Sequence, residues 1–211
     1  MKGKFIALEG IDGCGKTTQI KYLSKWLPSS GFMPKNAKLH ITREPGGTEL
    51  GLSLRKLLLD KNSLFQTSAT TELLLYAADR AQHISQLIAP AINKGDWVIS
   101  DRFSGSTIAY QGYGRNLNIP KIETLEKIAT DGILPDLTIL LNIKVSTSIT
   151  RRSKDIDDRI EAEGEDFLTL VSEGFNKLAC RRQWEIIDAE NDELIISKNI
   201  QKILTNHLTI N

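Results

Sequence analysis

The chain has 211 residues, with 27 basic and 26 acidic side chains and a formal net charge of +1. This length suits one domain spanning residues 1–211, and the balanced charge predicts neither a nucleic acid nor a membrane surface as partner. One of the two cysteines, Cys14, lies in a glycine-rich motif, so we expect no structural disulfide and a cytoplasmic protein. No secretory leader is evident, and no apolar stretch approaches the roughly 18 residues of a membrane span.

Short apolar runs alternate with helical patterns along the chain. The runs predict strands at residues 4–9, 39–42, 97–100, 137–143 and 185–187. Helical spacing of apolar residues predicts helices at 16–27, 49–59, 70–93, 122–129, 167–180 and 194–208. Short buried strands between helices indicate an α/β fold, a five-stranded parallel sheet with helices on both faces. Ligands of such sheets bind where the strands end.

A glycine-rich motif directly follows the first predicted strand. The motif has the pattern G-x-x-x-x-G-K-T, which is typical of a phosphate-binding loop between a strand and a helix. Glycines let consecutive backbone N–H groups converge on phosphate oxygens, while the lysine adds positive charge and the threonine a hydroxyl for Mg²⁺. The motif therefore predicts a bound nucleoside triphosphate. Its residues are Gly10, Ile11, Asp12, Gly13, Cys14, Gly15, Lys16 and Thr17, with Thr18 next.

Two further polar segments follow predicted strands. Asp101 and Arg102 come after the third strand, where an acid holds Mg²⁺ in nucleotide-binding proteins and an arginine can fork onto phosphate oxygens. The structural alternative is an acid that caps the next segment and pairs with Arg102. Arg43 follows the second strand, before Pro45 and two glycines. It is either aimed at a phosphate or an ordinary surface arginine beside a turn.

Tyr76 and Arg80 lie four residues apart on a predicted helix and so share a face. A flat ring beside a guanidinium suits a nucleobase. From spacing alone we favour the alternative, in which Tyr76 is half-buried core and Arg80 pairs with Asp79 or Glu72. The three histidines show no ligand spacing and receive no role.

A charged stretch at about 150–161 is predicted to be a lid. Basic and acidic side chains mix here, and the apolar pattern lapses. Most such runs are solvated loops. A lid would instead close arginines over a triphosphate and exclude water. The residues concerned are Arg151, Arg152, Lys154, Asp155, Asp157, Asp158 and Arg159.

Together these motifs resemble the thymidylate kinase family, in family order over essentially the whole chain. The matching segments are G-I-D-G-C-G-K-T-T at 10–18, T-R-E-P-G-G-T at 42–48, D-R-F at 101–103, A-Y-Q-G at 109–112, D-R-I-E at 158–161 and I-D-A at 187–189. The resemblance implies the phosphate-loop fold of nucleoside monophosphate kinases. It also implies transfer of the γ-phosphoryl group of ATP to dTMP, giving dTDP, with Mg²⁺ and usually in a homodimer.

The resemblance implies roles at the phosphates. Lys16 and Thr17 serve ATP and Mg²⁺, and Asp101 is the second candidate for the metal. Asp12, inside the loop, faces the 3′-hydroxyl of the acceptor sugar. The acceptor phosphate is gripped by Arg43 and Arg102.

At the base, the resemblance reverses our structural interpretation of Tyr76 and Arg80. Tyr76 matches the position that stacks on thymine, and Arg80 the arginine that reads a base carbonyl. Three further positions read the base edge and exclude ribose, namely Thr107, Tyr110 and Gln111.

The variable loop positions 11–14 hold no arginine, which resembles the bacterial type, in which the lid supplies the basic residues. Arg151 and Arg159 are the predicted lid contacts. A nucleoside kinase is one rival function, and it would need a carboxylate base such as Glu9 or Asp101. A GTP-binding switch would need an Asn-Lys-x-Asp sequence, but the fourth strand continues as N-I-K-V at 142–145.

Overall fold

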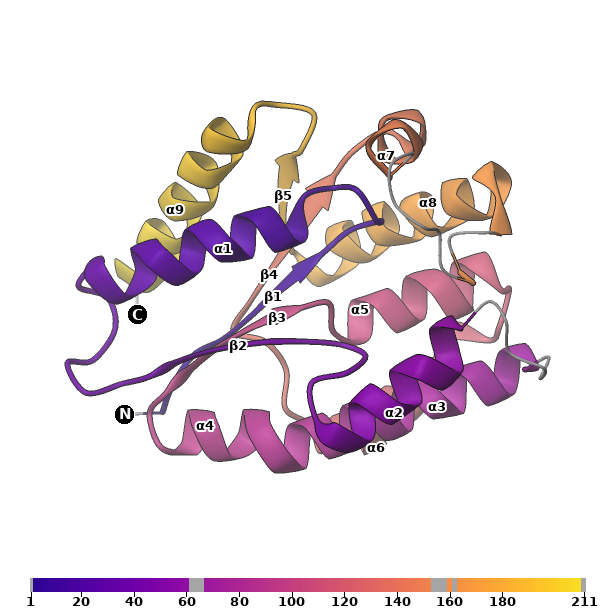
Figure 1. The fold of residues 1–211 in the computed structure, drawn as a ribbon, viewed down its shortest axis with the longest axis horizontal. Coiled ribbons are helices and arrows are strands. Elements are labelled where there is room, and N and C mark those ends of the chain that lie inside the picture. The colour runs from indigo at the N-terminus through magenta and orange to yellow at the C-terminus, as the bar shows by residue number, and fades with distance from the viewer. Residues whose placement is uncertain (1, 61–66, 153–158, 161–162, 210–211) are drawn as a thin grey trace.

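The structure is a computed structural model, and it describes residues 2–60, 67–152, 159–160 and 163–209. Five parallel strands form one sheet in the order β2-β3-β1-β4-β5, which confirms the predicted fold class (Figure 1). All five predicted strands are present. They are β1 (Phe5–Glu9), β2 (Leu39–Arg43), β3 (Trp97–Asp101), β4 (Leu137–Asn142) and β5 (Glu185–Asp188).

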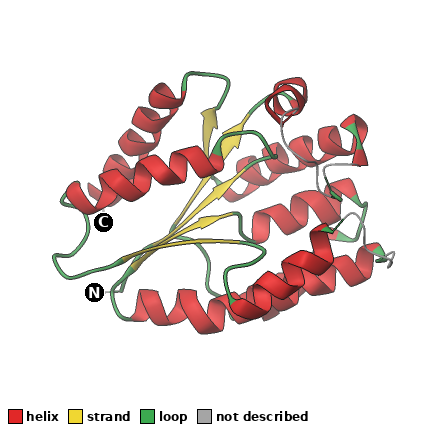
Figure 2. Cartoon of the chain, viewed as in Figure 1, coloured by secondary structure: helices red, strands yellow, loops and turns green. Residues whose placement is uncertain are grey.

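Helices cover both faces of the sheet. Figure 2 shows the strands between two helical layers. On one face α1 (Lys16–Trp26) packs beside α9 (Glu193–Thr209), and η1 (Leu27–Ser29) continues α1. The opposite side carries α2 (Glu49–Leu59), α3 (Ala69–His83), α4 (Ala89–Asn93), α5 (Ser104–Thr107) and α6 (Ile119–Thr130). Within the described residues, no helix has the length and apolar character to cross a membrane.

The helix predicted at 70–93 is wrong as a single α-helix. It consists of α3, a π-helical turn η2 (Ile84–Ile88) and α4. Pro90 has no N–H, and its ring excludes the carbonyl four residues back. The backbone widens before it, and the N–H of Ala89 donates to the carbonyl of Ile84.

Two helical segments were missed. Residues 104–114 form α5 and a π-helical stretch η3 (Ile108–Gly114), although three glycines lower their helix propensity. Residues 145–152 form α7 (Val145–Arg152), whose last three residues, 150–152, lie in the predicted lid. The helix α8 (Glu165–Arg182) packs against η3 and stabilises it.

Several apolar side chains of α2 and α3 are not covered by the core. On α3 the apolar side chains of Leu73 and Ala77 are buried, whereas Leu74 and Ala81 are exposed. On α2 Leu58 is buried, whereas Leu50 and Leu57 are each about half exposed. Both helices carry more leucine than the core covers, so the pattern alone did not identify the buried face.

Candidate active site

The phosphate loop joins β1 to α1. A side chain at Gly10, where φ is +139°, would place its Cβ 2.5 Å from the carbonyl oxygen of Leu141, so only glycine fits. The Nζ of Lys16 donates to the carbonyl oxygens of Gly10 at 3.1 Å and Ile11 at 3.2 Å. These contacts hold the ammonium group at the mouth of the loop, where a phosphate would lie.

Thr17 and Asp101 come together at the C-terminal edge of the sheet. The Thr17 hydroxyl donates to Oδ2 of Asp101 at 3.2 Å. Two oxygen ligands beside a phosphate loop fit Mg²⁺, which keeps most of its coordination for water and phosphate oxygens. The described residues hold no group of three or more His, Cys, Asp or Glu side chains that could bind a metal alone.

Arg102 links the loop to the cavity beside it. Its guanidinium donates to Oδ1 of Asp12 at 2.6 Å, to the carbonyl of Gly10 at 2.9 Å and to the hydroxyls of Ser106 at 2.9 Å and Tyr110 at 3.2 Å. Burial tends to raise the pKa of Asp12, but the charges of Arg102 and Lys16 outweigh it and hold that pKa well below its usual range. Asp12 is therefore an ionised acceptor inside the phosphate loop.

One cavity beside the loop collects every residue predicted to bind the acceptor. Its wall also includes Leu59, Ile160 and the ring of Phe103. Arg43, at the end of β2, is exposed, and it is paired in the sheet with Asp101 of β3. The eight predicted residues are Asp12, Arg43, Tyr76, Arg80, Arg102, Thr107, Tyr110 and Gln111.

Arg80 is held by a buried network that the sequence did not indicate. Its Nε donates to Glu44 at 2.8 Å, and a terminal nitrogen donates to the Thr107 hydroxyl at 2.9 Å. Glu44 also pairs with Nδ1 of His83 at 2.8 Å, and Nε2 of His83 lies 2.7 Å from the Thr42 hydroxyl. The partner of Arg80 is thus Glu44, not Asp79 or Glu72 as the structural interpretation supposed.

His83, which received no role, positions Arg80 through Glu44. The available signal was its spacing: His83 lies three residues after Arg80, on the same helix face. Asp79 adds to this network by accepting the N–H of Gly46 at 3.0 Å. Burial and the charge of Glu44 raise the pKa of Asp79 to about 6.

The two predicted lid contacts lie in different places. Arg151, at the end of α7, donates to the carbonyl oxygen of Ala189 at 3.0 Å and lies 3.5 Å from that of Gly13 in the phosphate loop. Arg159 instead pairs with Glu72 of α3 and donates to the carbonyl of Leu58 at 2.8 Å. The residues between them, 153–158, lie outside the described part of the chain, and they include Lys154, Asp155, Asp157 and Asp158.

Glu9 is buried and supports the segment that follows β3. Its carboxyl group accepts the N–H groups of Phe103 at 3.0 Å and Ser106 at 3.1 Å, and the Ser106 hydroxyl at 2.6 Å. Glu9 does not line the acceptor cavity. Burial raises its pKa from 4.5 to about 7. This carboxyl group fixes the start of α5, and with it Arg102, and the geometry gives it no acceptor hydroxyl to deprotonate.

The raised pKa of Glu9 predicts a pH dependence of stability. An acid whose pKa rises on folding stabilises the native state below its unfolded pKa and loses that contribution as pH rises through the folded value. Relative to Glu9→Gln, we expect the free energy of unfolding of the natural chain to fall by about 2–3 kcal/mol between pH 4.5 and 7.5. Urea unfolding of both proteins across this range measures it, and parallel pH profiles would contradict it.

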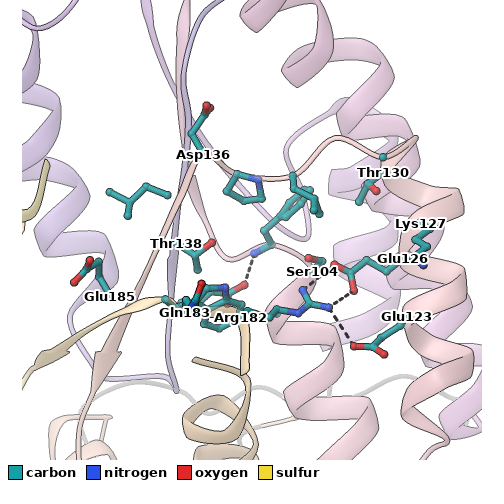
Figure 3. Close-up of a pocket in the computed structure, with 18 of the residues that line it drawn as sticks. Ser104, Glu123, Glu126, Lys127, Thr130, Asp136, Thr138, Arg182, Gln183 and Glu185 are labelled. Atoms are coloured by element: carbon teal, nitrogen blue, oxygen red, sulfur yellow. Dashed lines mark hydrogen bonds and ion pairs between the residues drawn. The ribbon is translucent and has the colours of Figure 1, made fainter. Parts of the chain in front are cut away.

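A larger cavity, of about 900 Å³, lies away from the phosphate loop (Figure 3). It opens between α6, the start of β4 and the end of α8, where Arg182 donates to Glu126 at 3.1 and 3.0 Å. None of the predicted site residues lines it. Volume alone therefore does not locate the active site, whereas the phosphate loop does.

A phosphate loop after β1, an acid at the end of β3 and an arginine-lined acceptor cavity beside them define a nucleoside monophosphate kinase of the phosphate-loop class. The thymidylate kinase family model matches residues 8–200, and the chain belongs to the thymidylate kinase family. It is therefore a kinase that phosphorylates dTMP to dTDP with ATP, as predicted.

Known relatives agree over the full length. The chain is 60% identical to a thymidylate kinase of Prochlorococcus marinus, covering 98% of this chain and 94% of the relative. It is 55% identical to one of Synechococcus sp. strain CC9605, covering 99% and 100%. The crystal structure of thymidylate kinase from Ehrlichia chaffeensis superposes with a TM-score of 0.76 at 30% identity, covering 97% of this chain and 99% of that one.

Proposed function

We propose that the γ-phosphoryl group of ATP passes to dTMP between the phosphate loop and the cavity lined by Tyr76 and Arg80. One observation carries this proposal: the loop and the cavity share the ion pair between Asp12 and Arg102, whose atoms lie 2.6 Å apart. A donor phosphate on the loop and an acceptor phosphate on Arg102 would thus be neighbours. Such proximity supplies much of the rate enhancement in phosphoryl transfer.

The donor side is assigned to the loop and to α7. Backbone N–H groups of the loop and Lys16 bind the ATP phosphates, aided by the N-terminal dipole of α1. Arg151 is the donor clamp we favour, because it already lies against the carbonyl of Gly13. The loop itself holds no arginine, so this charge must come from outside it. Arg159 is instead paired with Glu72 of α3.

The acceptor side is assigned to the cavity. Arg43 and Arg102 bind the phosphate of dTMP, and its oxygen attacks in line without a general base because it is already anionic. The carboxylate of Asp12 accepts a hydrogen bond from the 3′-hydroxyl of the sugar. Tyr76 stacks on thymine, and Arg80 donates to a base carbonyl.

A panel of acceptors tests this assignment. With ATP and Mg²⁺, we expect dTMP to have the highest kcat/KM among dTMP, dUMP, dCMP, AMP, GMP and thymidine. Preference for any other acceptor would refute the assignment of the cavity. We place the reaction in the cytoplasm because both cysteines are free thiols. Its product dTDP lies on the route to dTTP.

Mg²⁺ is assigned to Thr17 and Asp101, where it would neutralise the charge that develops on the transferred phosphoryl group. Asp101→Asn keeps the shape of the side chain but removes its charge. We expect kcat to fall about 10²-fold and the Mg²⁺ concentration for half-maximal rate to rise. Asp60→Asn, at the end of α2, is the matched control. An unchanged Mg²⁺ titration for Asp101→Asn would remove the residue from the metal site.

We also propose a homodimer formed through α2 and α3. These helices pack together and leave four leucines about half exposed, which is a typical interface core. Replacing Leu57 with glutamate is expected to give a monomer in sedimentation velocity, whereas Leu170→Glu on α8 leaves a dimer. A natural chain that sediments as a monomer would contradict the proposal. The four leucines are Leu50, Leu52, Leu57 and Leu74.

A further inference from the structure

Glu72 is a buried carboxylate on which three side chains from two separate segments converge. It lies in the first turn of α3, one turn before Tyr76, and is only 1% exposed. The side-chain nitrogen of Gln111 donates to its Oε1 at 2.9 Å, and Arg115 donates at 3.3 and 3.4 Å. Arg159 pairs with its Oε2. Glu72 does not itself line the acceptor cavity but lies behind a residue that does, Gln111.

This carboxylate remains ionised at neutral pH. Burial tends to raise the pKa of Glu72. The hydrogen bonds from Gln111 and Arg159 and the charge of Arg115 lower that pKa by more, so it lies below its ordinary value. An ionised carboxylate only accepts hydrogen bonds. A group held against it must therefore present its donor, and its acceptor must point elsewhere.

The consequence falls on the amide of Gln111. Its nitrogen is used by Glu72, so its Oε1 is the atom left to contact other groups, and in the described residues no donor reaches that oxygen. Gln111 is almost fully buried yet lines the cavity beside Arg80 and Thr107. The cavity thus offers a fixed acceptor from Gln111 and fixed donors from Arg80.

A fixed acceptor distinguishes pyrimidines by the state of the ring nitrogen. Thymine and uracil carry an N–H donor at N3, beside the carbonyl that Arg80 would read. Cytosine carries a lone pair at N3, so its N3 and the Oε1 of Gln111 would be two acceptors facing each other with no hydrogen between them. We propose that Glu72 is a positioning residue that sets base selectivity by holding the Gln111 amide with its oxygen toward the base. The inference rests on the proposed binding of dTMP in this cavity.

Glu72→Gln tests the inference. The substituted amide can donate or accept, so the Gln111 amide is free to turn over and offer its nitrogen to cytosine. We expect the ratio of kcat/KM for dTMP to that for dCMP to fall about tenfold or more. Glu72→Gln also weakens the pairing of Arg159, which would change kcat for both acceptors alike. The ratio of the two kcat/KM values therefore isolates the effect on base selectivity. Glu163→Gln, which removes the negative charge 2.6 Å from Arg115 and leaves Glu72 in place, should keep the ratio of the natural chain.

A double-mutant cycle separates positioning from general damage. Gln111→Leu removes the amide and should lower the ratio by itself, and Glu72→Gln should then add nothing to it. If Glu72→Gln does not fold, Glu72→Gln with Arg115→Gln removes one unpaired guanidinium and carries the same expectation. A ratio unchanged in the folded Glu72 variant, or additive losses in the cycle, would overturn the inference. If Gln111→Leu itself keeps the ratio, the base contact proposed for Gln111 has failed, and the inference fails with it.

Discussion

Replacing Lys16 with methionine is expected to abolish turnover, with kcat at least about 10³-fold lower. The ammonium group is held by two loop carbonyls and is 6% exposed, so its charge acts in a site of low dielectric, where it is worth more than in water. Methionine keeps the aliphatic stem but cannot neutralise the charge that develops on the transferred group. A coupled ADP-release assay at saturating ATP and dTMP measures the loss.

Stability should change little in this variant. Lys16→Met gives up three hydrogen bonds and a 3.9 Å ion pair with Asp12 but also a buried charge, so the free energy of unfolding is expected to shift by no more than about 1–2 kcal/mol. Lys21→Met, an exposed position on the same helix, is the matched control and should retain full activity. Activity of Lys16→Met within tenfold of the natural chain would show that the lysine is structural.

The strands could be predicted because buried parallel strands appear as short apolar runs, such as Phe5 to Leu8 of β1. The helices were harder to predict. No periodicity signals the widening before Pro90, and the glycines of η3 suppress a helix that only packing against α8 stabilises. Local pattern thus identified the sheet, and tertiary contacts decided the irregular helices.

The site residues also fall into some that local sequence predicts and others that only tertiary contacts reveal. The phosphate loop is contiguous in sequence, so Lys16 and Thr17 could be predicted from spacing alone. The roles of Tyr76 and Arg80 came only from the family resemblance. Their supporting residues were missed, because the partners lie far apart in the chain. His83 and Glu44 are 39 residues apart, as are Gln111 and Glu72. A single sequence carries no signal for such pairs.

Arg102→Ala is the second variant from which we expect a large effect, on activity and on stability together. The guanidinium bonds to four groups of the loop, α5 and η3, so its loss removes the acceptor-phosphate contact and the support of Asp12. We expect kcat to fall at least about 10³-fold and the free energy of unfolding to fall by about 2–4 kcal/mol. The expected loss of stability follows only from the structure, in which Arg102 is bonded within the fold. Its position at the end of a strand suggested only an arginine free to bind phosphate.

Two companion variants separate the two effects. Arg102→Lys keeps a charge but loses the fork that bonds Asp12 and Gly10 together, so it should recover stability more than activity. Asp12→Asn in the Arg102→Ala background removes the carboxylate left without its partner and should restore about 1–2 kcal/mol without restoring turnover. Thermal unfolding and the coupled assay on all four proteins measure this. If Arg102→Ala is as stable as the natural chain, the ion pair with Asp12 contributes nothing to the fold. Recovery of turnover in the double variant would mean that Arg102 serves only to neutralise Asp12 and does not bind the acceptor phosphate.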